Sequence, residues 1–239
     1  MRVGILKCDT FEKNLKKIFI DYDEVIYTFL SKSNYIEEAI TYDATIPLLP
    51  QINELSNLDC LIISGSRNNC LENLEWINQL KAYIRHCYNK DIKIIGFGFG
   101  HQIICDALGS KIESDGNWHT GTNKYNVNNN ILVKEIIGEN VKTITLPYLH
   151  EYKVLQVDNS KQIAIIEDSN EGILATISNN KKILTFAGHP EYNGKILWYL
   201  FRVYRDFMSG TELGKGQNTR NDENDSDFIS IIIGNLLGS

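Results

Sequence analysis

The seven residues at positions 96–102, Gly-Phe-Gly-Phe-Gly-His-Gln, constrain the fold of this chain more than any other stretch. The run before them, residues 92–95, is rich in β-branched isoleucine, which is typical of a buried strand. The run after them, residues 103–109, is largely apolar and ends in glycine, which is typical of a short helix with a glycine at its C-terminal end. The sequence therefore predicts a strand, a sharp turn and a helix.

Gly98 stands at the centre of the predicted turn, with Gly96 and Gly100 two residues away on either side. A residue at such a centre takes a strained backbone, commonly with positive φ, and its side chain would stand at the positive N-terminal end of the following helix. This position suits a reactive thiolate or hydroxyl. Gly98 has no side chain, but glycine accepts positive φ without a steric penalty, so it should relieve the strain.

The turn resembles the nucleophile elbow of the class I glutamine amidotransferase family, which typically reads G-x-C-x-G-H-Q, with Gly98 at the position of the cysteine. The sequence Gly-His-Pro-Glu at residues 188–191 matches the family segment whose histidine and glutamate complete a Cys-His-Glu triad. Ser-Gly-Ser at residues 64–66 is similar to the branch that contains γ-glutamyl peptidases and fungal amidotransferase-like proteins. The resemblance covers roughly residues 1–208.

The resemblance implies a role for each matching residue. Gly98 stands at the nucleophile position, His189 would be the base that moves the proton, and Glu191 would orient that base. The implied ligand is glutamine or a γ-glutamyl compound. Tyr152 stands where the family has an aspartate near the pocket, so substrate recognition departs from the family pattern here. The other implied site residues contact the oxyanion or line the glutamine pocket, and they are Gly65, Phe99, Gln102 and His150.

Without the cysteine, the chain is predicted to be catalytically inactive, either as a natural pseudoenzyme or as a disarmed variant. Loss of the nucleophile from a triad that acts as a unit, as in subtilisin, costs about 10⁶-fold in kcat, or about 8 kcal/mol. Cys8 and Cys70 each follow a predicted strand and are alternative nucleophiles, whereas Cys105 lies about 10 Å along the helix from position 98. Another alternative is a non-catalytic binding or regulatory subunit that uses the pocket or the apolar tail.

The composition narrows the class of protein. At 239 residues with 43% apolar content, the chain fits a single α/β domain with a sizeable core. The net charge of −6 without a basic cluster argues against nucleic-acid binding. The five cysteines are scattered and form no metal-binding pair, so we expect reduced thiols, no metal and no cofactor. No apolar run approaches the ~18 residues of a membrane span and no signal-peptide pattern is present, so we expect no membrane association and a cytoplasmic location.

Strand and helix patterns alternate up to about residue 109. This alternation predicts a doubly wound, mostly parallel sheet flanked by helices, as in the flavodoxin-like fold of the family, with the site at the carboxyl ends of the strands. Later segments, among them residues 131–137 and a hairpin around residue 180, are predicted as additional antiparallel strands. We expect His86 and His119 at the surface.

Three segments are expected along the chain. An amidotransferase-like domain covers residues 1–208, and a flexible linker covers residues 209–227, which are polar and rich in Asn, Asp and Glu. Residues 228–239 form an apolar C-terminal segment. This segment either docks on the domain, or mediates self-association or binding to a protein partner, or is a frayed end.

Overall fold

The computed structural model describes residues 1–32, 35–46, 49–218 and 223–238. Within these residues, nine strands form one continuous sheet. The strands, in chain order, are β1 (Arg2–Lys7), β2 (Glu38–Asp43), β3 (Cys60–Ile63), β4 (Ile94–Phe97), β5 (Lys111–Asn126), β6 (Thr143–Gln156), β7 (Gln162–Asp168), β8 (Gly172–Ser178) and β9 (Ile183–Phe186).

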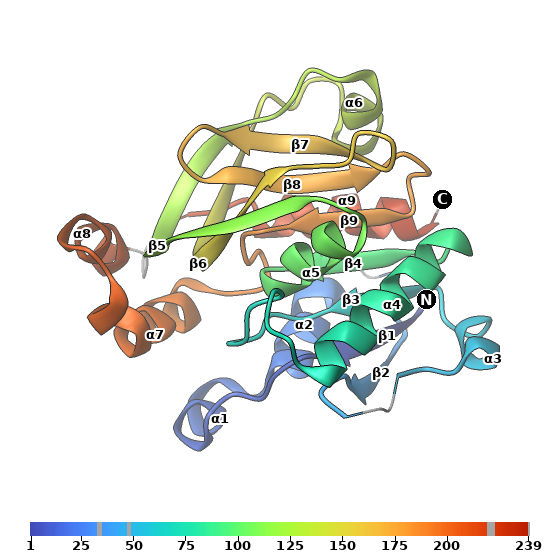
Figure 1. Ribbon diagram of the computed structural model, residues 1–239, viewed down its shortest axis with the longest axis horizontal. Helices are drawn as coiled ribbons and strands as arrows, with labels where there is room; N and C mark the ends of the chain where they lie inside the picture. The colour runs from blue at the N-terminus through green and yellow to red at the C-terminus, as the bar shows by residue number, and fades with distance from the viewer. Residues whose placement is uncertain (33–34, 47–48, 219–222, 239) are drawn as a thin grey trace.

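The sheet has a parallel half and an antiparallel half (Figure 1). Its order is β2-β1-β3-β4-β9-β8-β6-β5, with β7 paired to β8. The pairs from β2 to β9 are parallel, and the pairs beyond β9 are antiparallel. The predicted doubly wound α/β fold with antiparallel strands in the C-terminal half is confirmed, and the antiparallel part is as large as the parallel part.

Helices pack around the sheet. None of the helices in the described part of the chain is both long enough and apolar enough to span a membrane. The helices are α1 (Lys13–Phe19), α2 (Tyr22–Ser31), α3 (Ile52–Leu55), α4 (Glu75–Asn89), α5 (Phe99–Ala107), α6 (Ile131–Ile137), α7 (Gly194–Tyr204), α8 (Gly210–Asn218) and α9 (Ser226–Gly238), and the 3₁₀ helix η1 (Arg205–Phe207) follows α7.

The parallel half is buried on both faces. α3, α4 and α5 pack on one face, and α2 and α9 pack on the other; Figure 1 shows α4 and α5 in front of the strands. α4 presents a single apolar stripe that includes Ile77, Leu80 and Ile84, which are fully buried. β3 and β4 are buried along their whole length, which explains why their sequences are apolar runs without alternation.

Residues 131–137 form helix α6, so the prediction of a strand there was wrong. The side chain of Asn130 accepts a hydrogen bond from the N–H of Leu132 at 2.9 Å and caps the helix. Val133 and Ile137 lie one turn apart and are buried, whereas Ile131 is 84% exposed. The cap, with Gly138 at the other end, outweighs the strand preference of the β-branched residues in this run.

The C-terminal region is part of the same folded body. Residues 210–218, expected within a flexible linker, form helix α8, which packs against β5, while residues 219–222 lie outside the described part of the chain. Residues 226–238 form α9, which docks on the sheet face beside α2 and α6. The helix includes the last two residues of the expected linker and residues 228–238 of the expected apolar segment. The apolar side chains of α9 that are buried in this way are Ile229, Ile232, Ile233, Leu236 and Leu237.

Candidate active site

Three loops that carry predicted site residues meet at the carboxyl edge of the parallel strands. Gly65 follows β3, Gly98 follows β4, and His189 follows β9. β4 pairs with β3 on one side and with β9 on the other, so the three loops leave adjacent strands. The fold therefore brings together residues that lie far apart in the sequence.

The elbow has the backbone geometry that its sequence predicts. Gly98 has φ 54° and ψ −111°, and its N–H donates a hydrogen bond to the carbonyl of Phe186 on β9 at 2.9 Å. α5 begins at Phe99, whose N–H lies in the first turn, where amides have no acceptor within the helix. A Cβ atom at Gly100 would overlap the carbonyl oxygen of Ile63, so only glycine fits where α5 packs against β3.

His189 is fixed by three contacts. Its Nδ1 atom lies 2.7 Å from Oε1 of Glu191, and both side chains are buried. Its ring stacks on the ring of Tyr192, with the centroids 4.3 Å apart and the planes inclined by 3°. Its backbone N–H donates to the carbonyl of Pro147 at 2.7 Å. The residues predicted as base and orienting carboxylate are therefore in hydrogen-bond contact.

The imidazole of His189 lies directly against Gly98. A Cβ atom built on Gly98 would overlap Cε1 and Nε2 of the ring. The ring thus occupies the space that the side chain of a nucleophile would need. A cysteine at position 98 would fit only if His189 moved.

A cavity of about 100 Å³ lies beside the elbow. One water needs about 10–15 Å³ of such space, so the cavity has room for a small polar group of a ligand. All the predicted site residues line it except Glu191, which lies behind His189. The described lining residues are Tyr22, Gly65, Ser66, Arg67, Asn68, Asn69, Gly98, Phe99, Gln102, Trp118, Leu149, His150, Glu151, Tyr152, His189, Tyr192, Leu200 and Tyr204.

Two of the predicted pocket residues border the cavity through defined contacts. Nε2 of Gln102 donates to the carbonyl of Tyr152 at 3.1 Å, which ties α5 to β6. The backbone of Gly65 lies against the ring of His189, because a Cβ atom there would be 3.2 Å from Cε1 of that ring. The backbones of Gly65 and Phe99 therefore flank His189 and the elbow.

None of the five cysteines is among the described residues that line the cavity. All five are buried free thiols. Cys8 and Cys70, the alternative nucleophiles, are not among the described residues that line the cavity. Burial raises the pKa of Cys8, and it raises the pKa of Cys70 to about 12, so both thiols are protonated at neutral pH.

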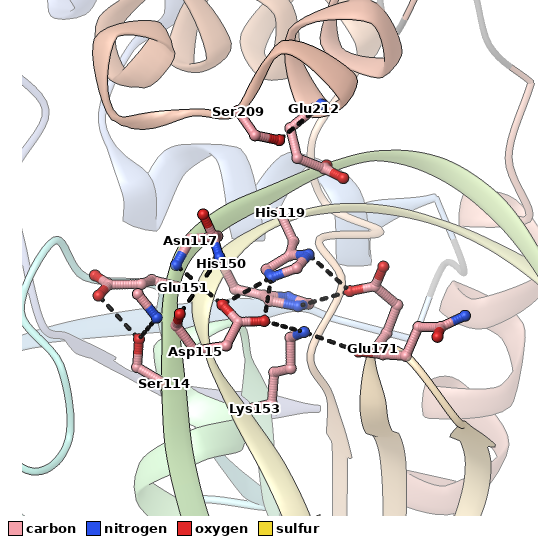
Figure 2. A network of polar contacts seen from close by, with 12 residues as sticks. Ser114, Asp115, Asn117, His119, His150, Glu151, Lys153, Glu171, Ser209 and Glu212 are labelled. Atoms are coloured by element: carbon pink, nitrogen blue, oxygen red, sulfur yellow. Dashed lines mark hydrogen bonds and ion pairs between the residues drawn. The ribbon is translucent and has the colours of Figure 1, made fainter.

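The other histidines differ in role. His101 is buried in the core, and its ring nitrogens contact Thr185 Oγ1 at 2.7 Å and the carbonyl of Ile173 at 3.0 Å. Burial lowers the pKa of His101 to about 3, which fits a structural residue. The expectation that His119 lies at the surface was wrong, because its side chain is only 14% exposed and belongs to a polar network of β5 and β6 (Figure 2). Among the described residues, no group of three or more His, Cys, Asp or Glu side chains is arranged to hold a metal ion.

The sequence did not identify several residues of the cavity wall. Tyr192 directly follows the Gly-His-Pro-Glu segment, and Arg67 directly follows Ser-Gly-Ser, so their closeness to these motifs was an available signal. Trp118 and Tyr204 line the cavity and stack on each other with centroids 4.3 Å apart, but they come from β5 and α7. No local pattern links two residues so far apart.

Comparison with known proteins places these features in a family. The model of the family described as glutamine amidotransferase class-I matches residues 18–197. A glutamine amidotransferase-like protein of Schizosaccharomyces pombe is 24% identical over 248 residues, an alignment that covers 98% of each chain. γ-Glutamyl peptidase 2 of Arabidopsis thaliana is 26% identical over 196 residues, which cover 79% of this chain and 77% of the relative.

Solved structures share the fold. A glutamine amidotransferase of Thermotoga maritima superimposes with a TM-score of 0.73 at 12% identity and covers 100% of this chain and 99% of its own. A glutamine amidotransferase of Methylobacillus flagellatus gives a TM-score of 0.70 at 14% identity, with 98% and 94% covered. Because the family match spans most of the chain, including the elbow and the Gly-His-Pro-Glu segment, the chain belongs to the class I glutamine amidotransferase family.

Proposed function

We propose that this protein binds glutamine or a γ-glutamyl compound in the cavity beside His189 and does not hydrolyse it. One observation carries the proposal: the elbow presents Gly98, and the imidazole of His189 fills the place of a nucleophile. The ligand class is supported by relatives named γ-glutamyl peptidase. On this proposal, the protein is a pseudoenzyme that keeps the pocket of its family.

The chemistry explains why turnover should be lost. Hydrolysis of the glutamine amide through a cysteine needs a thiolate that attacks the side-chain carbonyl, forms a thioester and releases ammonia. His189 and Glu191 can supply only the proton transfer, and the N–H groups of Gly65 and Phe99 can supply only oxyanion contacts. Without the sulfur that forms the bond, these groups can hold a ligand, and the barrier rises by about 8 kcal/mol.

The cavity, and not the C-terminal segment, is the proposed binding surface. The apolar side chains of α9 other than Phe228 and Ile231 are buried in this chain, so they are not offered to a partner. A protein that binds a γ-glutamyl ligand without turnover would act as a binding or regulatory protein.

Binding and turnover can be measured on the same unmodified protein. Isothermal titration with glutamine should show one site, and a coupled assay should show no release of ammonia above the rate without protein. Release of ammonia that depends on His189 would contradict the proposal. Absence of binding by both glutamine and a γ-glutamyl dipeptide would contradict it as well.

Gly98→Cys tests whether the rest of the site is competent. We expect this variant to hydrolyse glutamine at least about 10²-fold faster than Gly98→Ala, which adds the same Cβ atom without the sulfur. The gain should fall short of the full ~10⁶-fold because His189 must first move out of the space that the new side chain needs. A folded Gly98→Cys variant without activity would show that more than the nucleophile is missing.

A further inference from the structure

A guanidinium group lies in the wall of the cavity. Among the described residues that line the cavity, Arg67 is the only lysine or arginine, and its side chain is half exposed. Arg67 lies two residues after Gly65, in the loop that follows β3. The contacts proposed above for the γ-glutamyl group, which involve His189, Gly65 and Phe99, leave the charge of Arg67 unused.

Asp9 holds one side of the guanidinium. Asp9 follows β1, which pairs in parallel with β3, so Asp9 and Arg67 lie at the same edge of the sheet. Nε of Arg67 donates to Oδ2 of Asp9 at 2.9 Å, and the backbone N–H of Arg67 donates to the same oxygen at 2.9 Å. Nη2 of Arg67 donates to the carbonyl of Thr10 at 2.9 Å. These bonds fix the direction of the side chain.

Two more hydrogen bonds join the loops after β1 and β3. The hydroxyl of Ser66 donates to the carbonyl of Cys8 at 3.1 Å, and the N–H of Cys8 donates to the hydroxyl of Ser64 at 2.9 Å. They hold the segment that contains Gly65 and Arg67 against the neighbouring loop. A charge that is already held in place loses little conformational entropy when it binds a ligand, so the loop pair favours tight binding at Arg67.

The other edge of the guanidinium is open. Within the part of the chain that the structure describes, Nη1 of Arg67 donates no hydrogen bond to the protein, whereas Nε and Nη2 each donate to an oxygen. An arginine has five N–H donors in a planar fork. A carboxylate can therefore accept from Nη1 and from the second N–H of Nη2, in the paired arrangement that suits carboxylates.

The charge of Arg67 acts on the side of the loop that faces the cavity. Burial raises the pKa of Tyr22 and of Tyr204, and the positive charge of Arg67 opposes this rise in both residues. Tyr22 and Tyr204 line the cavity. The guanidinium therefore lies beside the space that a ligand would occupy.

A ligand only slightly longer than glutamine would reach Arg67. The Cα atoms of Gly65 and Arg67, two residues apart, are at most about 7 Å from each other. An amino acid attached through the γ-amide extends about 3.5 Å beyond that amide. With the γ-carbonyl at the N–H of Gly65, the carboxylate of one attached amino acid comes within reach of the arginine side chain, whereas glutamine ends at the amide.

We propose that Arg67 is a specificity-determining residue, which binds the C-terminal carboxylate of the amino acid attached to the γ-glutamyl group. The inference rests on the proposed function and narrows its ligand class to γ-glutamyl peptides with a free C-terminal carboxylate. Asp9 is the positioning residue, because it holds the guanidinium and does not itself line the cavity among the described residues.

The first test needs only the unmodified protein. Isothermal titration should show that γ-glutamylglycine binds about tenfold more tightly than γ-glutamylglycinamide, which has the same length but an uncharged end. We expect no larger ratio because Arg67 is half exposed and Asp9 offsets part of its charge. Equal affinity for the two dipeptides would overturn the inference and leave the proposed function intact. If neither dipeptide nor glutamine binds, the proposed function fails, and this inference fails with it.

The second test assigns the preference to one side chain. In Arg67→Gln the affinity ratio of the two dipeptides should fall to within about twofold, and in Arg67→Lys, which keeps the charge without the fork, it should be about threefold. The control is Arg85→Gln, which removes the same charge from an exposed position on α4 and should keep the tenfold ratio. A tenfold ratio in Arg67→Gln, or an equal fall in Arg85→Gln, would overturn the inference.

The salt dependence of the ratio gives a readout that a purely structural role of Arg67 would not move. Raising the ionic strength from about 0.1 M to about 1 M shortens the screening length from about 10 Å to about 3 Å, so the ratio in the unmodified protein should fall to about threefold. A ratio that does not change with salt would contradict an ionic contact. This measurement and the first test decide the question even if Arg67→Gln does not fold.

Discussion

Two buried histidine–carboxylate pairs lie beside the cavity. They differ in the distance between the histidine ring and its carboxylate. His189 and Glu191 are joined by a 2.7 Å contact, and the ring is also stacked on Tyr192. His150 and Glu171 are 3.6 Å apart, and among the described residues the facing atoms have no hydrogen-bond partner. The first pair is joined by a short contact, whereas the second pair is only loosely in contact.

The two pairs differ in their surroundings. The His189 ring lies in the space beside Gly98 and is held there by Glu191 and Tyr192. The predictions below test this contrast, in order of decreasing effect.

Gly98→Ala should have the largest effect on stability. The new Cβ atom would sit at a positive φ and overlap the His189 ring, so we expect a loss of about 3 kcal/mol in the free energy of unfolding, measured by urea denaturation. The matched control is Gly214→Ala in α8, where nothing lies within 4 Å. Removing a helical glycine there should stabilise the protein by up to about 1 kcal/mol. The same sign for both variants would argue against the close contact at the elbow.

The two carboxylates should differ when each is removed. Glu191→Ala leaves the buried Nδ1 of His189 without its partner and should cost about 2–3 kcal/mol in the free energy of unfolding. Glu171→Ala breaks only contacts of 3.5 Å and longer to the rings and should cost less than about 1 kcal/mol. Equal losses in urea denaturation would remove the contrast between the two pairs.

Acid should destabilise the protein through its buried neutral histidines. The pKa values of His101 and His150 are lowered by burial, so the unfolded chain binds more protons than the folded one below its own pKa of about 6.5. Stability is therefore complete above about pH 6.5 and falls as the pH is lowered toward the folded values. Urea denaturation at about pH 7.5 and pH 5.5 should differ by roughly 2 kcal/mol. An equal free energy of unfolding at these two pH values would mean that the rings of His101 and His150 are not buried.

Ser226→Ala should have a small and local effect. The hydroxyl of Ser226 on α9 donates to the carbonyl of Pro190 at 2.6 Å, beside His189. Its loss should cost about 1 kcal/mol and speed amide hydrogen exchange at His189. Ser230→Ala is the control, because the hydroxyl of Ser230 bonds only within α9, to the carbonyl of Asp227 at 2.7 Å. Equal exchange rates at His189 in the two variants would show that α9 does not hold the His189 pair.

Patterns confined to a short stretch of sequence predicted the fold well. The elbow, the strand before it, the helix after it and the hairpin that leads to His189 all follow from runs of a few residues. Residues 131–137 were misjudged because β-branched composition was given more weight than the capping Asn130. The polar composition of α8 predicts a linker and does not reveal the contacts of this helix with β5.

The sequence by itself determined the family, the positions of the elbow and of the Gly-His-Pro-Glu segment, and the absence of a side chain at residue 98. Each of these depends on residue identity and on short spacing along the chain. Only the tertiary structure decided that His189 fills the empty elbow, that Glu171 approaches His150, and that α9 is buried. These features depend on packing between segments distant in sequence, where shape and free space, and not local preference, fix the outcome.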